Sequence, residues 1–336
     1  MSRIVSVFGA GSWGTALAQV LARNRHDVRL WCHNGEQAEQ INRNGYNPFY
    51  LTDYPLLPQI QASPSLAETA QASDLWLFVT PTQHLRPLLE ALEPYYRQEV
   101  KIANAAKGME IGSLRLISQI VGELFPEAPY TVISGPSHAE ETIRNLPLAL
   151  VAASASPTTA ELWQSLLNRD TFRVYTNSDV TGVEVGGAVK NVIAIASGLL
   201  CSMEMGDNSR AAMVTRGLSE IVRLGTAMGA QPQTFLGLAG IGDLMVTAYS
   251  RHSRNFRFGE LLGQGLTMDE AIRSLGQVVE GAFTVKAVQE LSARLSVEMP
   301  ISSAVFQILY EGLPLKNAMK NLLNRSPKPE MQEFRS

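Results

Sequence analysis

Three glycines near the N-terminus, Gly9, Gly11 and Gly14, have the spacing of a loop that binds a pyrophosphate. The apolar run Ile4 to Phe8 before them has the character of a buried strand, and a helical pattern follows from Thr15 to Arg23. In such a unit the first glycine permits a tight turn, the second lets the backbone approach a phosphate, and the third lets the helix pack closely on the strand. The first amides of the helix then face the anion. We therefore expect dinucleotide binding; the alternative is a purely structural turn.

The acid that usually binds a ribose hydroxyl is absent from its expected place. It belongs about 20 residues after the loop, at the end of the second strand. Here the second candidate strand, Val28 to Cys32, ends in His33 and Asn34. Glu36 comes late, and Asp27 precedes the strand. A 2′-phosphate would meet no repulsion there, but no arginine replaces the acid, so the choice between NADPH and NADH stays open.

Lys190 lies in a segment, residues 183–198, that is apolar or small on nearly every side. Such a helix is buried, and its neighbours one turn away cannot neutralise an ammonium. Burial lowers the pKa of a lysine towards the working range of a general acid or base. We therefore expect Lys190 to donate a proton to a carbonyl during reduction. The alternative is a lysine that escapes at a helix edge or pairs structurally, for instance with Glu184.

Polar residues that follow predicted strands are candidates for substrate contacts, because ligands of open α/β sheets bind beyond the carboxyl ends of the strands. Thr80-Pro-Thr-Gln83, Lys107 and Ser134-Gly-Pro-Ser-His138 have this placement. Lys107 can hold a phosphate or hydroxyl as a compact cation, and Gly135 and Ser137 offer amides and a hydroxyl at a turn. The alternatives are a solvated surface lysine and an ordinary turn before a helix.

A further polar cluster, Ser253, Arg254 and Asn255, supplies a hydroxyl, a guanidinium fork and an amide, which together suit phosphate recognition. Arginines at 251, 254 and 257 recur every three residues, so a solvated basic helix face is the alternative. Asp243 ends a glycine-rich stretch and can orient Lys190 or a substrate hydroxyl. The histidines and cysteines show no metal-ligand spacing, and no G-x-S-x-G elbow is present, so we expect neither a metal site nor an acyl-transfer hydrolase.

Two domains must position these residues. In residues 1–180 apolar runs alternate with helical patterns, which predicts an α/β domain with a parallel, doubly wound Rossmann sheet that binds NAD(P). Its strands are expected at Ile4–Phe8, Val28–Cys32, Leu75–Thr80, Val100–Asn104, Tyr130–Ile133, Ala149–Ala152 and Phe172–Tyr175. Residues 181–336 carry long helical periodicities, which predicts a mostly helical domain for substrate binding and catalysis. Within it, Thr267-Met-Asp-Glu270 has the pattern of a capping box.

Composition narrows the class of protein. A length of 336 residues suits about two domains, and a hydrophobic content of 45% is ample for globular cores. The net charge of -3 gives no electrostatic reason to expect nucleic acid or an anionic membrane as partner. The two cysteines suit a reducing cytoplasm, and no secretion signal is recognisable. Lys190 and Asn191 interrupt the most apolar stretch, residues 185–203, so we expect a buried helix, no stable membrane insertion and a cytoplasmic location.

Taken together, these blocks resemble the bacterial-type NAD(P)-dependent glycerol-3-phosphate dehydrogenases. In order along nearly the whole chain they are Gly9-Ala-Gly-Ser-Trp-Gly-Thr-Ala16, Ala106-Lys-Gly-Met-Glu110, Ile133-Ser-Gly-Pro-Ser-His-Ala-Glu140, Gly186-Gly-Ala-Val-Lys-Asn-Val-Ile-Ala194, Gly240-Ile-Gly-Asp243, His252-Ser-Arg-Asn-Phe-Arg-Phe-Gly259 and Gly276-Gln-Val-Val-Glu-Gly281. The resemblance implies reduction of dihydroxyacetone phosphate to sn-glycerol 3-phosphate, a phospholipid precursor, with NADPH or NADH. It also implies a homodimer.

The resemblance assigns roles to individual residues. Lys190 matches the family's proton acceptor for the oxidative direction. Substrate contacts are implied for Lys107, Gly135, Ser137, Asp243, Ser253, Arg254 and Asn255. Besides the three loop glycines, cofactor contacts are implied for Ser12, Trp13, His33, Asn34, Tyr50, Lys107, Ala139, Arg254, Val278 and Glu280. Asn34 stands where many relatives carry arginine, which leaves the NADP preference open.

Two other functions fit parts of the pattern. A dehydrogenase of the 6-phosphogluconate or hydroxyisobutyrate type also joins a Rossmann domain to a helical domain with a lysine and an asparagine, but it would oxidise a hydroxy acid. A non-catalytic dinucleotide sensor would bind cofactor without turnover. Lys190 and the Ser253-Arg-Asn255 cluster argue against the sensor.

Overall fold

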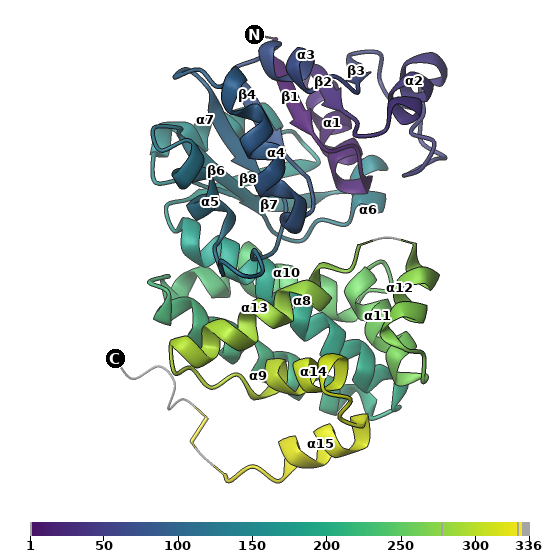
Figure 1. The fold of residues 1–336 in the computed structure, drawn as a ribbon, viewed down its shortest axis with the longest axis vertical. Coiled ribbons are helices and arrows are strands. Elements are labelled where there is room, and N and C mark those ends of the chain that lie inside the picture. The colour runs from purple at the N-terminus through teal and green to yellow at the C-terminus, as the bar shows by residue number, and fades with distance from the viewer. Residues whose placement is uncertain (1, 277, 328, 331–336) are drawn as a thin grey trace. The chain divides into compact units, whose positions relative to one another are not determined.

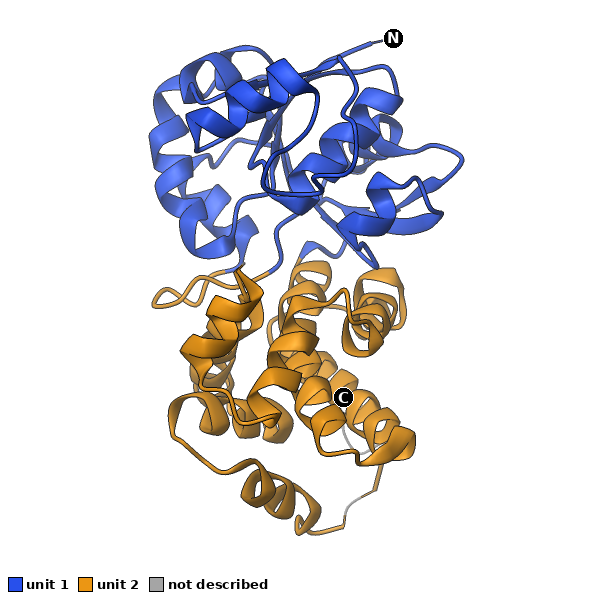
Figure 2. Cartoon of the chain, turned by 90° about the vertical axis from the view of Figure 1, so that its right-hand side faces the viewer, with its two compact units in different colours: residues 1–107, 116–180 blue, residues 108–115, 181–336 orange. Residues whose placement is uncertain are grey.

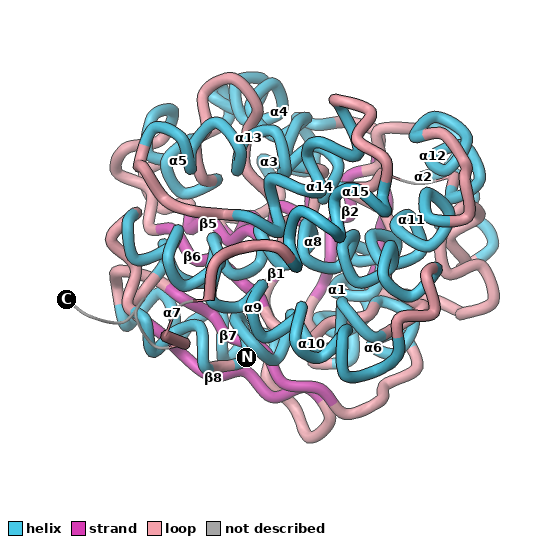
Figure 3. Tube along the Cα trace, turned by 90° about the horizontal axis from the view of Figure 1, so that it is seen from below, coloured by secondary structure: helices cyan, strands magenta, loops and turns pink. Residues whose placement is uncertain are grey.

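The computed structural model describes residues 2–276, 278–327 and 329–330, and the chain divides into two compact units. Unit 1 comprises residues 1–107 and 116–180, and unit 2 comprises residues 108–115 and 181–336 (Figure 2). The strands (magenta in Figure 3) all belong to unit 1 in the described part of the chain, whereas unit 2 is built from helices. The segment Gly108–Arg115, which was expected in the first domain, groups with the helical unit.

Unit 1 contains an eight-stranded sheet in the order β3-β2-β1-β4-β5-β6-β7-β8. The strands are β1 Ile4–Phe8, β2 Asp27–Trp31, β3 Ile60–Ser63, β4 Leu75–Phe78, β5 Lys101–Asn104, β6 Tyr130–Ser134, β7 Leu148–Ala153 and β8 Phe172–Asn177. Neighbouring strands are parallel except β6 and β7, which are antiparallel. The predicted parallel, doubly wound Rossmann fold is confirmed, with β6–β7 as an antiparallel pair within it. The chain between β6 and β7 contains the five-residue helix α6 (Ala139–Ile143).

Helices cover both faces of the sheet, because successive strand side chains alternate between two apolar cores. Val7 and Leu77 belong to one core, together with residues of α1 and α7. Phe8 and Phe78 belong to the other, together with residues of α4 and α5 (Figure 1). Burial on both faces explains why the strands read as continuous apolar runs. The other helices of unit 1 are α1 Ser12–Arg23, α2 Gly35–Asn44, α3 Leu66–Gln71, α4 Leu85–Leu92, α5 Ile117–Leu124 and α7 Pro157–Leu167.

The sequence did not predict the edge strand β3. It has four residues, and its burial alternates along the strand instead of being continuous. Asn42 of α2 holds this strand through its side-chain amide. Its Nδ2 donates to the carbonyl oxygen of Ala62 (2.8 Å), and its Oδ1 accepts from the amide of Ala62 (2.9 Å). The strand therefore depends on tertiary contacts that a local pattern does not reveal.

Unit 2 contains one helix, α8 (Val180–Ser202), that is buried along residues 182–200. By length and composition α8 is apolar enough to cross a membrane, but 89% of its apolar window is buried inside the protein, which confirms the expected buried helix. The backbones of α8 and α11 (Arg254–Gly263) approach each other closely at Gly259. A Cβ at this position would lie 2.1 Å from the carbonyl oxygen of Ile195 on α8, so no larger residue fits. The remaining helices are α9 Gly206–Ala227, α10 Asp243–Tyr249, α12 Met268–Leu275, α13 Glu280–Arg294, α14 Pro300–Tyr310 and α15 Leu315–Leu323. Thr267 and Glu270 form the predicted capping box of α12.

Candidate active site

The glycine loop after β1 has the backbone that its sequence predicts. Gly9 has a φ of 121°, and a Cβ at Gly14 would lie 1.8 Å from the carbonyl oxygen of Gly9, so both positions require glycine. Helix α1 starts at Ser12, three residues earlier than predicted, with Gly11 as its N-cap. Ser12 and Trp13 therefore form its first turn.

The same loop fits a dinucleotide pyrophosphate. The amides of residues 12–14 start a helix and have no intrahelical acceptor, and no side chain caps this end of α1 in the described part of the chain. Such amides favour an anion. A Cβ at Gly11 would meet no atom within 4 Å, so Gly11 borders open space. Gly9 and Gly14, in contrast, are required for packing within the protein.

At the end of β2, the structure uses Asn34 as a helix cap. Its Oδ1 accepts from the amides of Glu36 (2.8 Å) and Gln37 (3.2 Å) and so begins α2. His33 is exposed beside Trp31, with ring centroids 5.9 Å apart. Tyr50 lies half-buried in the loop that follows α2. The residues expected at the ribose end of a cofactor thus lie after β2 and after α2.

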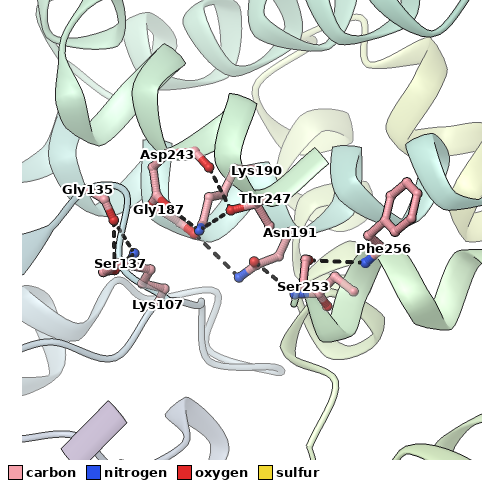
Figure 4. Close-up of polar contacts among 11 residues, drawn as sticks. Lys107, Gly135, Ser137, Gly187, Lys190, Asn191, Asp243, Thr247, Ser253 and Phe256 are labelled. Atoms are coloured by element: carbon pink, nitrogen blue, oxygen red, sulfur yellow. Dashed lines mark hydrogen bonds and ion pairs between the residues drawn. The ribbon is translucent and has the colours of Figure 1, made fainter. Parts of the chain in front are cut away.

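Lys107, Gly135 and Ser137 come together in unit 1 (Figure 4). Nζ of Lys107 donates to the carbonyl oxygen of Gly135 (2.9 Å) and to Oγ of Ser137 (3.1 Å), and Oγ of Ser137 donates to the same carbonyl (2.8 Å). Lys107 is half-buried, so the alternative of a freely solvated lysine is wrong. Ala139, which starts α6, is buried next along the chain. This cluster places a cation and a hydroxyl at the carboxyl ends of β5 and β6.

Lys190 of α8 and Asp243 of α10 form a buried ion pair in unit 2 (Figure 4). Nζ of Lys190 lies 2.5 Å from Oδ1 of Asp243, and the side chains are 7% and 0% exposed. Nζ also donates to Oγ1 of Thr247 (2.7 Å), whose hydroxyl donates to the main-chain oxygen of Asp243 (2.6 Å). The structure therefore combines two expectations, a buried lysine and an aspartate that orients it. A carboxylate beside an ammonium stabilises its protonated, donating form.

The Ser253-Arg-Asn255 cluster begins α11. Oγ of Ser253 accepts from the amide of Phe256 (3.2 Å) as the N-cap, which leaves the hydroxyl hydrogen to donate. Arg254 is exposed, and its Nη1 donates to the carbonyl oxygen of Val278 (3.3 Å). Arg254 therefore lies beside the segment that enters α13, whose first residue is Glu280.

Asn255 differs from the expectation of a simple substrate ligand. It is buried, its Nδ2 donates to Oδ1 of Asn191 on α8 (2.9 Å), and its Oδ1 accepts from the amide of Gly281 on α13 (2.9 Å). Asn255 therefore joins three helices around the position of Lys190. Asn191 directly follows Lys190 in the sequence, but no role in the site was expected for it.

Other residues of the site were also missed. Thr247 follows Asp243 by four residues, so a shared helix face was a usable signal. Gln37 and Asn47 contact the glycine loop from α2 and from the loop after it, at 2.8 and 3.0 Å from the carbonyl oxygen of Ala10. Nothing in their spacing relative to the glycines indicates this contact.

A Rossmann sheet with an anion-binding glycine loop, together with a helical unit that holds a buried lysine on a carboxylate, defines the class of NAD(P)-dependent dehydrogenases. Residues 4–160 match a family model described as the N-terminus of NAD-dependent glycerol-3-phosphate dehydrogenase, and residues 179–320 match the model of its C-terminus. The chain belongs to the NAD-dependent glycerol-3-phosphate dehydrogenase family.

Individual relatives match over nearly the full length. A protein of Carboxydothermus hydrogenoformans named glycerol-3-phosphate dehydrogenase (NAD(P)+) is 44% identical over 329 residues, covering 97% of this chain and 98% of the relative. The protein of that name from Latilactobacillus sakei is 45% identical over 333 residues, with coverage of 97% and 98%. A crystal structure of glycerol-3-phosphate dehydrogenase from Coxiella burnetii superposes with a TM-score of 0.93 at 37% identity, covering 96% of this chain and 99% of the other.

Proposed function

We propose that this protein is an NAD(P)-dependent glycerol-3-phosphate dehydrogenase that reduces dihydroxyacetone phosphate to sn-glycerol 3-phosphate, reversibly, with NADPH or NADH. The observation that carries the proposal is the buried Lys190–Asp243 pair in a chain that matches relatives of this name over almost its whole length. Reduction of a carbonyl needs a proton donor, and a buried, oriented ammonium is one. The product would supply the glycerol backbone of phospholipids.

Unit 1 would hold the dinucleotide. Gly9, Gly11 and Gly14 would receive its pyrophosphate at the start of α1. When bound, the nicotinamide supplies the hydride for the carbonyl carbon of the substrate. The family pattern assigns further cofactor contacts to Ser12, Trp13, His33, Asn34, Tyr50, Lys107 and Ala139 in unit 1, and to Arg254, Val278 and Glu280 in unit 2.

Lys190 would donate a proton from Nζ to the C2 oxygen of the substrate as the hydride reaches C2, so that the carbonyl becomes a hydroxyl. Asp243 and Thr247 fix Nζ by two hydrogen bonds, which reduces the reorganisation that proton transfer requires. In the oxidative direction, Nζ of a neutral Lys190 would accept the hydroxyl proton.

Arg254 and Ser253 would bind the substrate phosphate at the start of α11. A guanidinium fork, a hydroxyl hydrogen and the first amides of a helix are complementary to a phosphate. Lys107, Gly135, Ser137, Asp243 and Asn255 are the other proposed substrate contacts. Among these, Lys107 is the compact cation, which suits a phosphate or hydroxyl group of the substrate.

One assay tests the proposed function. The absorbance of NADPH and, separately, of NADH is followed after dihydroxyacetone phosphate is added to the purified protein. We expect oxidation of at least one cofactor and formation of sn-glycerol 3-phosphate. Parallel reactions with 6-phosphogluconate or 3-hydroxyisobutyrate and oxidised cofactor test the rival dehydrogenases. Folded protein that oxidises neither cofactor with dihydroxyacetone phosphate contradicts the proposal.

We further propose that the enzyme works in the cytoplasm as a homodimer on this small-molecule substrate, without nucleic acid or membrane insertion. The two free cysteines suit a reducing compartment, and the burial of α8 argues against membrane insertion. The homodimer follows from the family resemblance alone. Light scattering on a sizing column should give twice the 36.7 kDa chain mass. A value of one chain mass at assay concentration contradicts the dimer.

A further inference from the structure

Three buried side chains converge on the carbonyl oxygen of Ala10, in the middle of the glycine loop. Nε2 of Gln37 donates to it at 2.8 Å, Nδ2 of Asn47 at 3.0 Å and Oγ1 of Thr15 at 3.4 Å. Gln37 is 6% exposed, and Asn47 and Thr15 are 0% exposed. Residues of α1, of α2 and of the loop after α2 thus hold one peptide group of the loop.

Asn47 also holds the turn that contains Phe49 and Tyr50. Its Oδ1 accepts from the amides of Phe49 (3.1 Å) and Tyr50 (3.2 Å), and its Nδ2 also donates to Oγ1 of Thr15 (2.8 Å). Because two backbone amides face one end of the Asn47 side chain, that end must be the oxygen and the NH2 group must face Ala10. Gln37 completes the network, since its Nε2 donates to Oδ1 of Asn47 at 3.1 Å.

The fixed carbonyl of Ala10 determines the direction of the next amide. No cis peptide bond occurs in the described part of the chain, and a trans peptide directs its carbonyl and its N–H to opposite sides. With the oxygen of Ala10 held among buried donors, the N–H of Gly11 points away from them. Gly11 is also the residue whose Cβ would border open space. A peptide without these donors could turn and present its oxygen, which repels an anion.

We propose that Asn47, assisted by Gln37, is a positioning residue for the dinucleotide. It holds the Ala10–Gly11 peptide so that the amide of Gly11 donates to the pyrophosphate, and the same side chain orders the turn that carries Tyr50. This inference rests on the proposed function only in taking the ligand to be a dinucleotide. Asn47 acts through the loop and not by touching the ligand.

Two substitutions test the proposal by different routes. Asn47→Asp replaces the NH2 group with an oxygen that repels the carbonyl of Ala10, yet it keeps the acceptor for Phe49 and Tyr50. Gln37→Met removes a second donor with little change in volume, and it decides the question if Asn47→Asp does not fold. Calorimetry without substrate measures the affinity for NADPH, NADH, ADP-ribose and adenosine, and the melting temperature of the apo protein reports folding.

We expect Asn47→Asp to weaken binding of NADPH, NADH and ADP-ribose about tenfold or more, which is the range of a lost hydrogen bond to a charged group. Gln37→Met should weaken the same three by a smaller factor. Affinity for adenosine should stay unchanged in both, because adenosine lacks the pyrophosphate. Asn42→Asp is the matched control, since Asn42 also clamps a peptide from α2, but at Ala62 of β3. It should leave all four affinities unchanged.

Unchanged affinity for ADP-ribose in folded Asn47→Asp, or in Gln37→Met if the first variant does not fold, overturns the inference. An equal loss of adenosine affinity also overturns it, because the effect would then not be specific to the pyrophosphate. Wild-type protein that binds NADPH but does not reduce dihydroxyacetone phosphate contradicts the proposed function alone, since the affinities still decide the role of Asn47.

Discussion

At the scale of single residues, the Lys190–Asp243 pair should affect both the proposed proton transfer and the free energy of unfolding. Both side chains lie almost entirely out of water, so each charge depends on the other for compensation. Replacing such a pair with apolar residues is often neutral for stability, whereas removing one partner is costly. The proposed proton transfer therefore accounts for this pair better than stabilisation of unit 2 does.

Lys190→Ala should lower kcat with dihydroxyacetone phosphate by at least about 100-fold, since general acid catalysis contributes that much or more. Affinity for NADPH should change little, because the glycine loop belongs to unit 1. The free energy of unfolding should fall by about 3–5 kcal/mol, because the buried carboxylate of Asp243 loses the ammonium of Lys190. Steady-state kinetics, calorimetry and urea unfolding measure the three quantities. Near-normal turnover would remove Lys190 from its proposed role.

A double variant separates the lost stability from the lost chemistry. Lys190→Met combined with Asp243→Leu removes both charges and keeps the site filled. Its unfolding free energy should recover most of what the single variant loses, while kcat stays low. Recovery of turnover together with stability would mean that Lys190 acts only on folding.

Arg254→Ala should raise the KM for dihydroxyacetone phosphate by about 10–100-fold, which corresponds to a lost hydrogen bond between charged groups. Arg257→Ala is the matched control, because Arg257 is exposed on the same helix. The comparison requires initial rates at saturating NADPH over a range of substrate concentrations. Equal KM values for the two variants would count against a phosphate site at the start of α11.

At the scale of elements, local sequence patterns were sufficient to predict the strands and helices that are buried on all sides. β1 and β4 are apolar on both faces, and α8 is apolar nearly all round, so their continuous apolar runs were sufficient to predict them. The edge strand β3 was missed because Asn42 and β2 hold it from outside its own sequence. The Lys190–Asp243 contact joins residues 53 positions apart, and only their types suggested it. Asn47 lies 37 positions from Ala10, and no rule of spacing relates an asparagine to a glycine loop.

The contact between α9 and the start of α14 depends on Glu220, a buried titratable side chain, so its contribution to stability should depend on pH. The buried carboxylate accepts from the amides of Ile301 (2.6 Å) and Ser302 (3.0 Å) at the start of α14. Burial raises the pKa of Glu220 to about 7 from an ordinary value of 4.5, against the opposing effect of these donors and of Arg223. A raised pKa means that the folded protein binds this proton more tightly than the unfolded chain does. The contribution to stability is therefore complete below pH 4.5 and is lost as the pH rises through 7.

Glu220→Gln should remove this part of the pH dependence, because glutamine does not titrate. The melting temperatures of both proteins are measured at several values between pH 5 and pH 8. We expect the wild-type curve to fall more steeply than that of the variant, even if the variant is less stable at low pH through loss of one acceptor. Parallel curves would show that Glu220 does not titrate in this range.

At the scale of the whole molecule, unit 1 carries the proposed cofactor loop and unit 2 carries the proposed proton donor. Substitutions in the glycine loop should therefore impair cofactor binding, whereas substitution of Lys190 should impair proton transfer. Ligand binding also stabilises the folded protein by an amount that depends on its affinity, so melting temperatures can distinguish the two kinds of defect.

Gly11→Val should leave the apo protein stable and abolish its response to cofactor. The backbone at Gly11 is extended, with a φ of -73°, and a Cβ there would meet nothing within 4 Å, so the side chain of valine would start in open space and extend into the region proposed for the pyrophosphate. For the wild type, NADPH at 100 times its Kd should add about 2.7 kcal/mol to the free energy of unfolding. Gly11→Val should show neither this gain nor turnover, although Lys190 and Asp243 are intact.

Gly14→Ala provides the contrast within the same loop. Its Cβ would lie 1.8 Å from the carbonyl oxygen of Gly9, so this variant should lose stability even without cofactor. Thermal melts of both variants with and without NADPH therefore separate a glycine required for ligand space from one required for packing. If Gly11→Val keeps the wild-type gain with NADPH, the pyrophosphate does not bind at this loop, and the assignment of unit 1 as the dinucleotide unit fails with it.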